Sequence, residues 1–89
     1  MGVKWNVSFH RYAVKDLERL QHAGLAGKAR SIAELLEQNP FQNPPPYEKL
    51  SGNLRGLYSR RINRQHRLVY EVDEAAKAVR VLRMWTHYE

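Results

Sequence analysis

Arginine is the side chain in this sequence that is best suited to chemistry on a phosphate group. A guanidinium is permanently charged and presents a rigid fork of donors that matches phosphate oxygens. The second half of the chain contains Arg55, Arg60, Arg61, Arg64, Arg67, Arg80 and Arg83. Their concentration there favours a ligand that contains phosphate.

The side chains that most often hold transition metals follow no metal-binding pattern. The four histidines are scattered, without an i,i+4 pair that flanks a carboxylate, and there is no cysteine. Zinc and related ions need several such ligands brought together. We therefore expect no metal and no cofactor, and neither disulfide nor thiolate chemistry.

The charge balance indicates the same kind of partner. Lys and Arg number 15 against 9 Asp and Glu, which leaves a net charge of +6 and a pI near 10.0. A polyanion or an acidic protein is the natural partner of such a surface. The alternative is a solvated face crossed by surface ion pairs, because basic domains often bind nothing specific. Charge alone does not identify an activity.

The first half of the chain predicts one strand and two helices. Val3, Trp5, Val7 and Phe9 alternate with polar or small neighbours, which predicts a short strand with one buried face. Residues 10–23 and 26–38 each carry apolar residues every three or four positions, which is typical of amphipathic helices. Gly24 and Asn39-Pro40 end them, and the short turn makes the helices antiparallel. The apolar residues of the first helix are Ala13, Val14, Leu17 and Leu20, and those of the second are Ala29, Ile32, Ala33 and Leu36.

The second half predicts a sheet. Residues 41–53 carry all but one of the four prolines and form an irregular loop. Residues 54–62, 68–72 and 79–86 are rich in β-branched, aromatic and Leu side chains, and polar turns separate them, so they form a three-stranded antiparallel meander. The helices cover one face in a two-layer α+β fold and leave the other face for a partner. Packing is the role expected for Trp5, Tyr58, Tyr70 and Trp85.

Length and hydropathy set the organisation of the protein. A chain of 89 residues is long enough for one domain and too short for two independent cores, so residues 1–89 are expected to form a single domain. No apolar run approaches the roughly 18 residues that cross a bilayer. The N-terminus has no continuous apolar signal segment. We expect a cytoplasmic protein with no membrane partner.

Residues 51–72, SGNLRGLYSRRINRQHRLVYEV, together with the later His-Tyr pair, resemble the signature of YoeB/Txe-type toxins of the RelE superfamily. The resemblance covers the whole chain, including the Asn-Pro-Phe segment that ends the second helix. Two features depart from the family pattern: the turn at 63–65 reads Asn-Arg-Gln where relatives often have acidic residues, and Glu89 follows the His-Tyr pair.

This resemblance implies a microbial RNase-like fold and the toxin half of a bacterial type II toxin–antitoxin system. The implied activity is endonucleolytic cleavage of messenger RNA in the ribosomal A site, which inhibits translation. The implied partners are the ribosome, its messenger RNA and an acidic, YefM-like antitoxin. A homodimer is a further option.

The resemblance also implies a chemistry. The neighbouring 2′-hydroxyl acts as nucleophile, without a metal ion, and the products are a cyclic phosphate and a free 5′-hydroxyl. A base must take the 2′-hydroxyl proton, a cation must neutralise the phosphoryl oxygens, and an acid must protonate the departing oxygen. Glu48, Arg67 and His87 match the family positions for these steps in that order. Tyr88 completes the catalytic set by stacking on a base rather than by moving a proton.

Each catalytic candidate also has a purely structural interpretation. Glu48 is an acid at the end of a loop, Arg67 is an exposed strand arginine paired with Glu71, and His87 is a terminal histidine. The resemblance favours the catalytic interpretation, and the chemistry suits it. A carboxylate is deprotonated at neutral pH, a guanidinium keeps its charge, and an imidazole accepts and releases a proton near neutrality.

The neighbours of these residues receive separate predictions. Lys49 either contacts phosphate or offsets the charge of Glu48, and it joins Arg61 as an RNA-binding candidate. Arg60 and Arg61 are adjacent on a strand, so their side chains point to opposite faces, and the family position favours Arg61. His66 is expected to help the hairpin form rather than to join the site.

A protein of another class is the competing hypothesis. It is a non-catalytic nucleic-acid-binding module, or a RelE-like toxin that acts on another target such as a topoisomerase. Such a protein would not need Glu48, Arg67 and His87 together, so the presence of all three favours the nuclease. A large distance between Arg67 and His87 would favour the binder.

Overall fold

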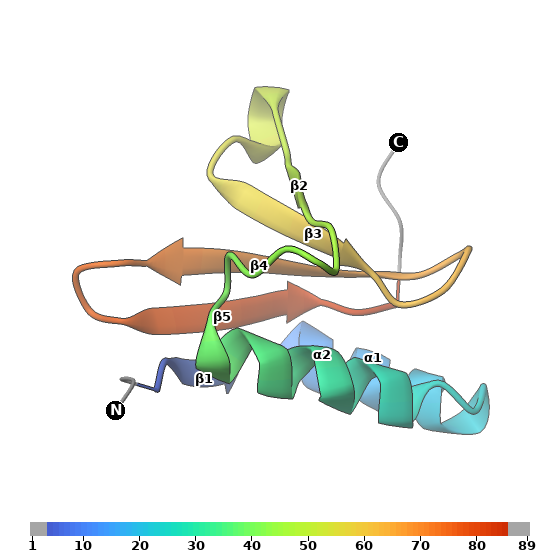
Figure 1. Ribbon diagram of the computed structural model, residues 1–89. Helices are drawn as coiled ribbons and strands as arrows, with labels where there is room; N and C mark the ends of the chain where they lie inside the picture. Colours follow the sequence, from blue (N-terminus) through green and yellow to red (C-terminus); the bar gives the residue numbers. More distant parts are fainter. Residues whose placement is uncertain (1–3, 86–89) are drawn as a thin grey trace.

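The computed structural model describes residues 4–85, which form one sheet with two helices packed across one of its faces (Figure 1). In chain order the elements are β1 (Asn6–Phe9), α1 (Arg11–His22), α2 (Ala26–Gln38), β2 (Glu48–Lys49), the 3-10 turn η1 (Gly52–Leu54), β3 (Leu57–Arg61), β4 (Arg67–Asp73) and β5 (Ala78–Arg83). This arrangement confirms the predicted α+β fold.

The sheet contains the predicted meander and one additional strand on each side of it. The strand order is β1-β5-β4-β3-β2, and β3, β4 and β5 are antiparallel neighbours. The N-terminal strand β1 pairs in parallel with β5, so the sheet as a whole is mixed. β1 and β5 are distant in sequence, so no hairpin constrains their relative direction.

The strand β2 lies inside a segment that was predicted to be an irregular loop. Glu48 and Lys49 pair with Ser59 and Tyr58 of β3, and the prediction is wrong for these two residues. They follow the last proline, so their N–H groups are free to join a sheet edge. The backbone N–H of Leu50 continues the pairing by donating to the carbonyl of Leu57. Glu48 is therefore fixed to the sheet.

The first helix buries a different set of residues from the one predicted. Val14 was placed on the apolar stripe, but it is 50% exposed. Asp16 is buried instead, together with Ala13 and Leu20. Positions 13, 16 and 20 follow the three- and four-residue spacing of one helix face, whereas position 14 is turned away from it.

The second helix has the predicted bounds. Gly24 precedes it with a φ of 76°, a left-handed conformation that glycine adopts without steric penalty. The chain turns back there, so that α2 runs beside α1 (Figure 1). Ala29, Ile32 and Leu36 face the sheet from α2. Within residues 4–85, no helix is long and apolar enough to cross a membrane.

The core lies between the helices and the sheet. Tyr70 is fully buried there, and the other aromatic residues predicted to pack, Trp5, Tyr58 and Trp85, are partly buried against the core. The prediction for β1 is only partly right. Val7 packs on the core, but Phe9 is exposed at the end of this edge strand, and Val3 lies outside the described residues.

Candidate active site

The candidate site is built on the strands β2, β3 and β4. Glu48 lies opposite Ser59, and Arg61 lies opposite Arg67. Side chains directly opposite in a sheet point to the same side, and so do residues two apart on one strand. These four side chains therefore share one side of the sheet, although Glu48 and Arg67 are 19 positions apart in sequence.

Two of the predicted residues are in direct contact. Arg67 forms a hydrogen-bonded ion pair with Glu48 through Nη2 and donates from Nε to Ser59 Oγ over 2.8 Å. The alternative pairing of Arg67 with Glu71 is wrong, because the carboxylate paired with Arg67 is that of Glu48. The Arg67 side chain is 18% exposed and that of Glu48 is 65% exposed. The cation is thus held in place, while the carboxylate is open to a ligand.

These residues open onto a pocket of about 360 Å³ whose charged lining is mostly basic. Its walls are Lys28, Ile32, Pro45, Pro46, Glu48, Arg60, Arg61 and Arg67. The cations outnumber the single carboxylate, so an anionic ligand is favoured. Lys28 was not predicted for the site. It stands four residues before the buried Ile32 on α2, and this helical spacing places both on neighbouring turns of one side.

The remaining predicted site residues are Lys49, His87 and Tyr88. Lys49 is exposed on β2 and is not part of the pocket lining, so its RNA-binding role stays a prediction. His87 and Tyr88 lie outside the described residues. No group of three or more potential metal-ligating His, Cys, Asp or Glu side chains occurs among residues 4–85.

Arg60 is buried beneath the pocket and holds the proline-rich segment that leads to Glu48. It is 1% exposed. Its guanidinium donates to three backbone carbonyls, those of Pro40, Gln42 and Pro45, at 3.0, 2.9 and 2.8 Å. The expectation that Arg60 and Arg61 point to opposite sides is confirmed, since Arg61 is exposed. The alternation of side chains along a strand predicted that the two arginines point to opposite sides, but it did not predict which carbonyls Arg60 binds.

Tyr70 supports the same segment from β4. Its hydroxyl donates to the Pro40 carbonyl at 2.8 Å and accepts from Arg60 Nε at 3.2 Å. Burial raises the pKa of Tyr70 although the charge of Arg60 opposes this shift. The phenol therefore stays protonated and keeps its role as a donor.

A family model described as the YoeB-like toxin of bacterial type II toxin–antitoxin systems matches residues 9–88. The chain belongs to this family. It is thus a type II toxin, as the sequence resemblance indicated. No curated protein sequence matches the chain.

Solved structures of YoeB toxins share the fold over nearly the whole chain. A YoeB/ParE toxin from Agrobacterium tumefaciens is 27% identical, with a TM-score of 0.83, and the match covers 93% of this chain and 99% of that one. The Staphylococcus aureus YoeB dimer is 32% identical, with a TM-score of 0.79 and coverages of 96% and 99%. A YoeB–YefM complex from the same organism matches with 32% identity, a TM-score of 0.77 and the same coverages.

In this YoeB-like toxin, the residue before Arg67 contacts the end of the described chain. His66 is buried, and its ring stacks on Trp85 with the ring centroids 4.1 Å apart. Its Nδ1 is also hydrogen-bonded to the Trp85 carbonyl. The backbone N–H of His66 donates to Asn63 Oδ1 at 2.7 Å, which supports the predicted role in the hairpin. The contact with Trp85 was not predicted.

Proposed function

We propose that this toxin is a ribosome-dependent endoribonuclease that cuts messenger RNA and so inhibits translation. The observation that carries the proposal is the contact between Arg67 and Glu48 in a pocket that is otherwise basic. A base and a cation in contact can act on a 2′-hydroxyl and on the phosphate next to it. A surface that only bound RNA would gain nothing from a carboxylate at this position, because it repels phosphate.

The proposed reaction begins at Glu48. Its carboxylate takes the proton of a 2′-hydroxyl, and the 2′-oxygen attacks the adjacent phosphorus. The bond from phosphorus to the 5′-oxygen breaks, which leaves a cyclic phosphate on one fragment and a 5′-hydroxyl on the other. By family resemblance His87 supplies the proton for that oxygen, and Tyr88 stacks on a base. No metal ion takes part in this scheme.

Arg67 stabilises the negative charge that grows on the phosphoryl oxygens. Its Nε hydrogen bond to Ser59 can persist during the reaction, because it does not involve the nitrogen that contacts Glu48. The guanidinium is therefore oriented before the substrate arrives. Loss of one such electrostatic contact commonly lowers a rate by about 10²–10³.

Binding of the RNA backbone is assigned to the cations around this pair. Arg61 and Lys28 line the pocket, and Lys49 follows Glu48 on β2. The pocket offers little to align a flexible strand for in-line attack. We propose that the ribosome supplies this alignment, which can account for a large part of a rate.

The proposed partners outside the reaction follow from charge and from the relatives. The net charge of +6 suits an acidic antitoxin, and a Staphylococcus aureus relative has been solved with YefM. A relative also forms a dimer, and we extend both a YefM-like antitoxin and a homodimer to this chain as proposals. The site of action is the cytoplasm, where messenger RNA is translated.

The test is to map RNA ends in an active translation extract. Wild-type protein is compared with Glu48→Gln and with Glu18→Gln, which removes an exposed carboxylate from α1. We expect new 5′-hydroxyl ends within translated codons for wild-type and Glu18→Gln protein, and almost none for Glu48→Gln. If the toxin stops the growth of cells that express it but produces no new RNA ends in the extract, the proposal is contradicted, and a toxin that acts on another target, such as a topoisomerase, is favoured.

A further inference from the structure

The connecting segment, residues 40–47, joins α2 to β2 and forms one wall of the candidate active site. Pro45 and Pro46 line the pocket, and Glu48 follows the segment directly. Figure 1 shows the segment, in green, running from the end of α2 to β2. It contains all four prolines of the chain, which have no backbone N–H, and it forms no helix or strand. Its position must therefore be fixed by contacts from other parts of the protein.

Arg60 supplies such contacts along the whole connecting segment. Its Nη2 donates to the carbonyls of Pro40 and Gln42 at 3.0 and 2.9 Å, and its Nη1 donates to the carbonyl of Pro45 at 2.8 Å. The guanidinium carbon lies 5.0 Å from the centroid of the Tyr47 ring. One side chain thus contacts the segment at its start, at its middle and at the residue before Glu48.

The position of Arg60 on β3 relates these contacts to the catalytic pair. Arg60 is fully buried, and its Nε donates to the Tyr70 hydroxyl at 3.2 Å, so the guanidinium is itself held in place. The preceding residue, Ser59, accepts a hydrogen bond from Arg67 and lies opposite Glu48. Two consecutive residues of β3 therefore hold the two halves of the site: Ser59 orients the cation, and Arg60 holds the segment that leads to the carboxylate.

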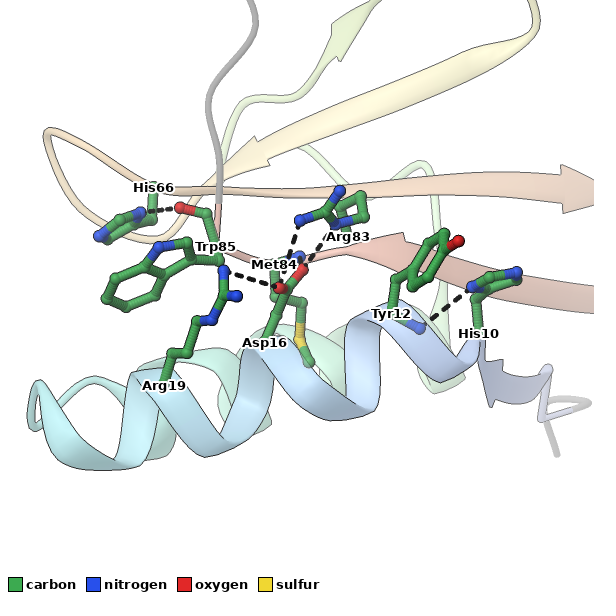
Figure 2. A network of polar contacts seen from close by, with 8 residues as sticks. All are labelled: His10, Tyr12, Asp16, Arg19, His66, Arg83, Met84 and Trp85. Atoms are coloured by element: carbon green, nitrogen blue, oxygen red, sulfur yellow. Dashed lines mark hydrogen bonds and ion pairs between the residues drawn. The ribbon is translucent and has the colours of Figure 1, made fainter.

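A second network of buried polar groups lies elsewhere in the molecule. It is centred on Asp16 of α1, whose carboxylate accepts hydrogen bonds from Arg83 and from the backbone of Met84 (Figure 2). All the residues drawn there lie within the described range 4–85, and none of them is among the residues that line the pocket. Arg60 and its partner Pro45, by contrast, both line it. The Arg60 network is thus the one that reaches the candidate site.

We propose that Arg60 is a positioning residue of the toxin: by binding three carbonyls of the connecting segment, it fixes Glu48 and the Pro45–Pro46 wall in front of Arg67. This inference rests on the proposed nuclease function and deepens it. All three guanidinium nitrogens of Arg60 donate to groups of the protein, so Arg60 acts through the segment and not on the substrate.

The simpler interpretation is that Arg60 only stabilises the fold. The connecting segment is already anchored by packing, because the rings of Phe41 and Tyr47 contact that of Tyr58. A buried charge is costly, and an apolar side chain could fill the same space. A guanidinium is planar and presents its donors in fixed directions, so it holds the three carbonyls in one arrangement. An apolar side chain would pack against the segment without defining where these carbonyls lie.

The test is Arg60→Lys, measured as single-turnover cleavage on saturated ribosomes. Lys keeps the charge, but its single nitrogen cannot replace a rigid fork of donors. We expect cleavage to fall at least about tenfold, while ribosome affinity stays within about twofold. In a Glu48→Gln background the same change should lower the rate by less than about twofold, because the base that Arg60 positions is already absent. Equal losses in both backgrounds would overturn the inference.

Leu20→Ala is the control for a general loss of stability. Leu20 is buried on α1 and is not among the residues that line the pocket, and its truncation leaves a cavity in the core. Its cleavage rate should match that of wild type at a temperature where thermal melts show both proteins to be folded. A loss equal to that of Arg60→Lys would mean that lowered stability explains the effect, and the inference would fail.

A second variant serves if Arg60→Lys does not fold. Tyr70→Phe keeps the buried ring and removes the hydroxyl that binds both Arg60 and the Pro40 carbonyl. We expect the cleavage rate to fall about threefold in the wild-type background and to stay unchanged beside Glu48→Gln. An unchanged rate of folded Tyr70→Phe in the wild-type background would then contradict the positioning role.

A readout that does not depend on cleavage is the NMR signal of the Glu48 carboxyl carbon, which reports the contact with Arg67. We expect this signal to shift in folded Arg60→Lys and to stay in place in Leu20→Ala. If wild-type protein cuts no RNA, the proposed function fails, and the Glu48 signal still decides whether Arg60 positions that carboxylate. An unchanged Glu48 signal in folded Arg60→Lys would overturn the inference.

Discussion

Arg67 Nε donates a hydrogen bond of 2.8 Å to Ser59 Oγ, and the two residues lie on neighbouring antiparallel strands. Ser59 is almost fully buried, so its hydroxyl is a fixed partner. The other partner of the guanidinium, Glu48, is largely exposed. Arg67 is therefore oriented by one partner that stays and one that a substrate can displace. Such preorganisation lowers the entropy lost when phosphate binds.

Replacing Ser59 with Ala tests how much the orientation of Arg67 contributes to the cleavage rate. We expect single-turnover cleavage on saturated ribosomes to fall about tenfold while ribosome affinity changes less than about twofold, since the charge of Arg67 remains but its direction is no longer fixed. Stability should fall by about 1 kcal/mol through the lost hydrogen bond. Ser31→Ala is the matched control, because that exposed hydroxyl bonds only within α2. Wild-type cleavage by folded Ser59→Ala would show that the hydroxyl is dispensable.

Residues that react and residues that bind should differ when they are replaced one at a time. We expect Glu48→Gln and His87→Gln each to lower cleavage by about 10²–10⁴ with ribosome affinity within a few-fold, and Arg67→Ala to resemble them. Arg61→Ala should instead weaken binding and reduce its salt dependence by about one phosphate contact. Cleavage rates and binding at several salt concentrations distinguish the two classes. Near wild-type rates in both Gln variants would refute acid–base catalysis by these residues.

Arg60 should contribute much more to the free energy of unfolding than its exposed neighbour Arg61. Removing its guanidinium in Arg60→Met leaves the carbonyls of Gln42 and Pro45 without this donor, and leaves the Pro40 carbonyl with the Tyr70 hydroxyl alone. We expect a loss on the order of 3 kcal/mol in the free energy of unfolding, measured by urea denaturation. Arg61→Met, which removes an exposed neighbour, should change it by less than about 0.5 kcal/mol. Equal effects of the two variants would contradict the buried role.

Sequence patterns predicted the elements whose spacing repeats. The bounds of α2 follow from periodicity, because a helix must bury one face. The three strands of the meander follow from their β-branched, aromatic and Leu side chains and from the polar turns between them. Arg60 and Arg61 were also separated correctly, since adjacent strand residues point to opposite sides. These predictions need only local geometry.

The structural features that could not be predicted from the sequence depend on contacts between segments that are far apart in the chain. Asp16 falls on the buried stripe of α1 by spacing, but no role was predicted for it from the sequence, and a carboxylate is seldom buried without a partner. Only its bonds to Arg83 and Met84, 67 and 68 positions later, make its burial favourable. The edge strand at Glu48 has the same origin, since two residues show no period. Both features depend on how distant segments pack in the folded sheet, so the sequence of one segment does not predict them.

Asp16 also predicts how the stability of the toxin depends on pH. Burial alone would raise the pKa of this carboxyl, but hydrogen bonds from Arg83 and from the Met84 amide outweigh burial and hold the pKa below its ordinary value of 3.8. The folded state thus binds this proton less readily than the unfolded state does. The stabilising contribution is present above about pH 3.8 and is lost as the pH falls through the lower pKa of the folded state.

Urea denaturation of wild type and Asp16→Asn between pH 7 and pH 2.5 tests this dependence. At neutral pH we expect Asp16→Asn to be less stable by on the order of 3 kcal/mol, because Arg83 loses its buried anionic partner. The difference should narrow below about pH 4, since the wild-type carboxyl then becomes protonated and resembles the neutral amide. Glu18→Gln, which changes an exposed carboxylate on the same helix, should stay close to wild type at neutral pH. A difference between wild type and Asp16→Asn that did not change with pH would mean that shape, and not the charge of Asp16, holds the end of β5.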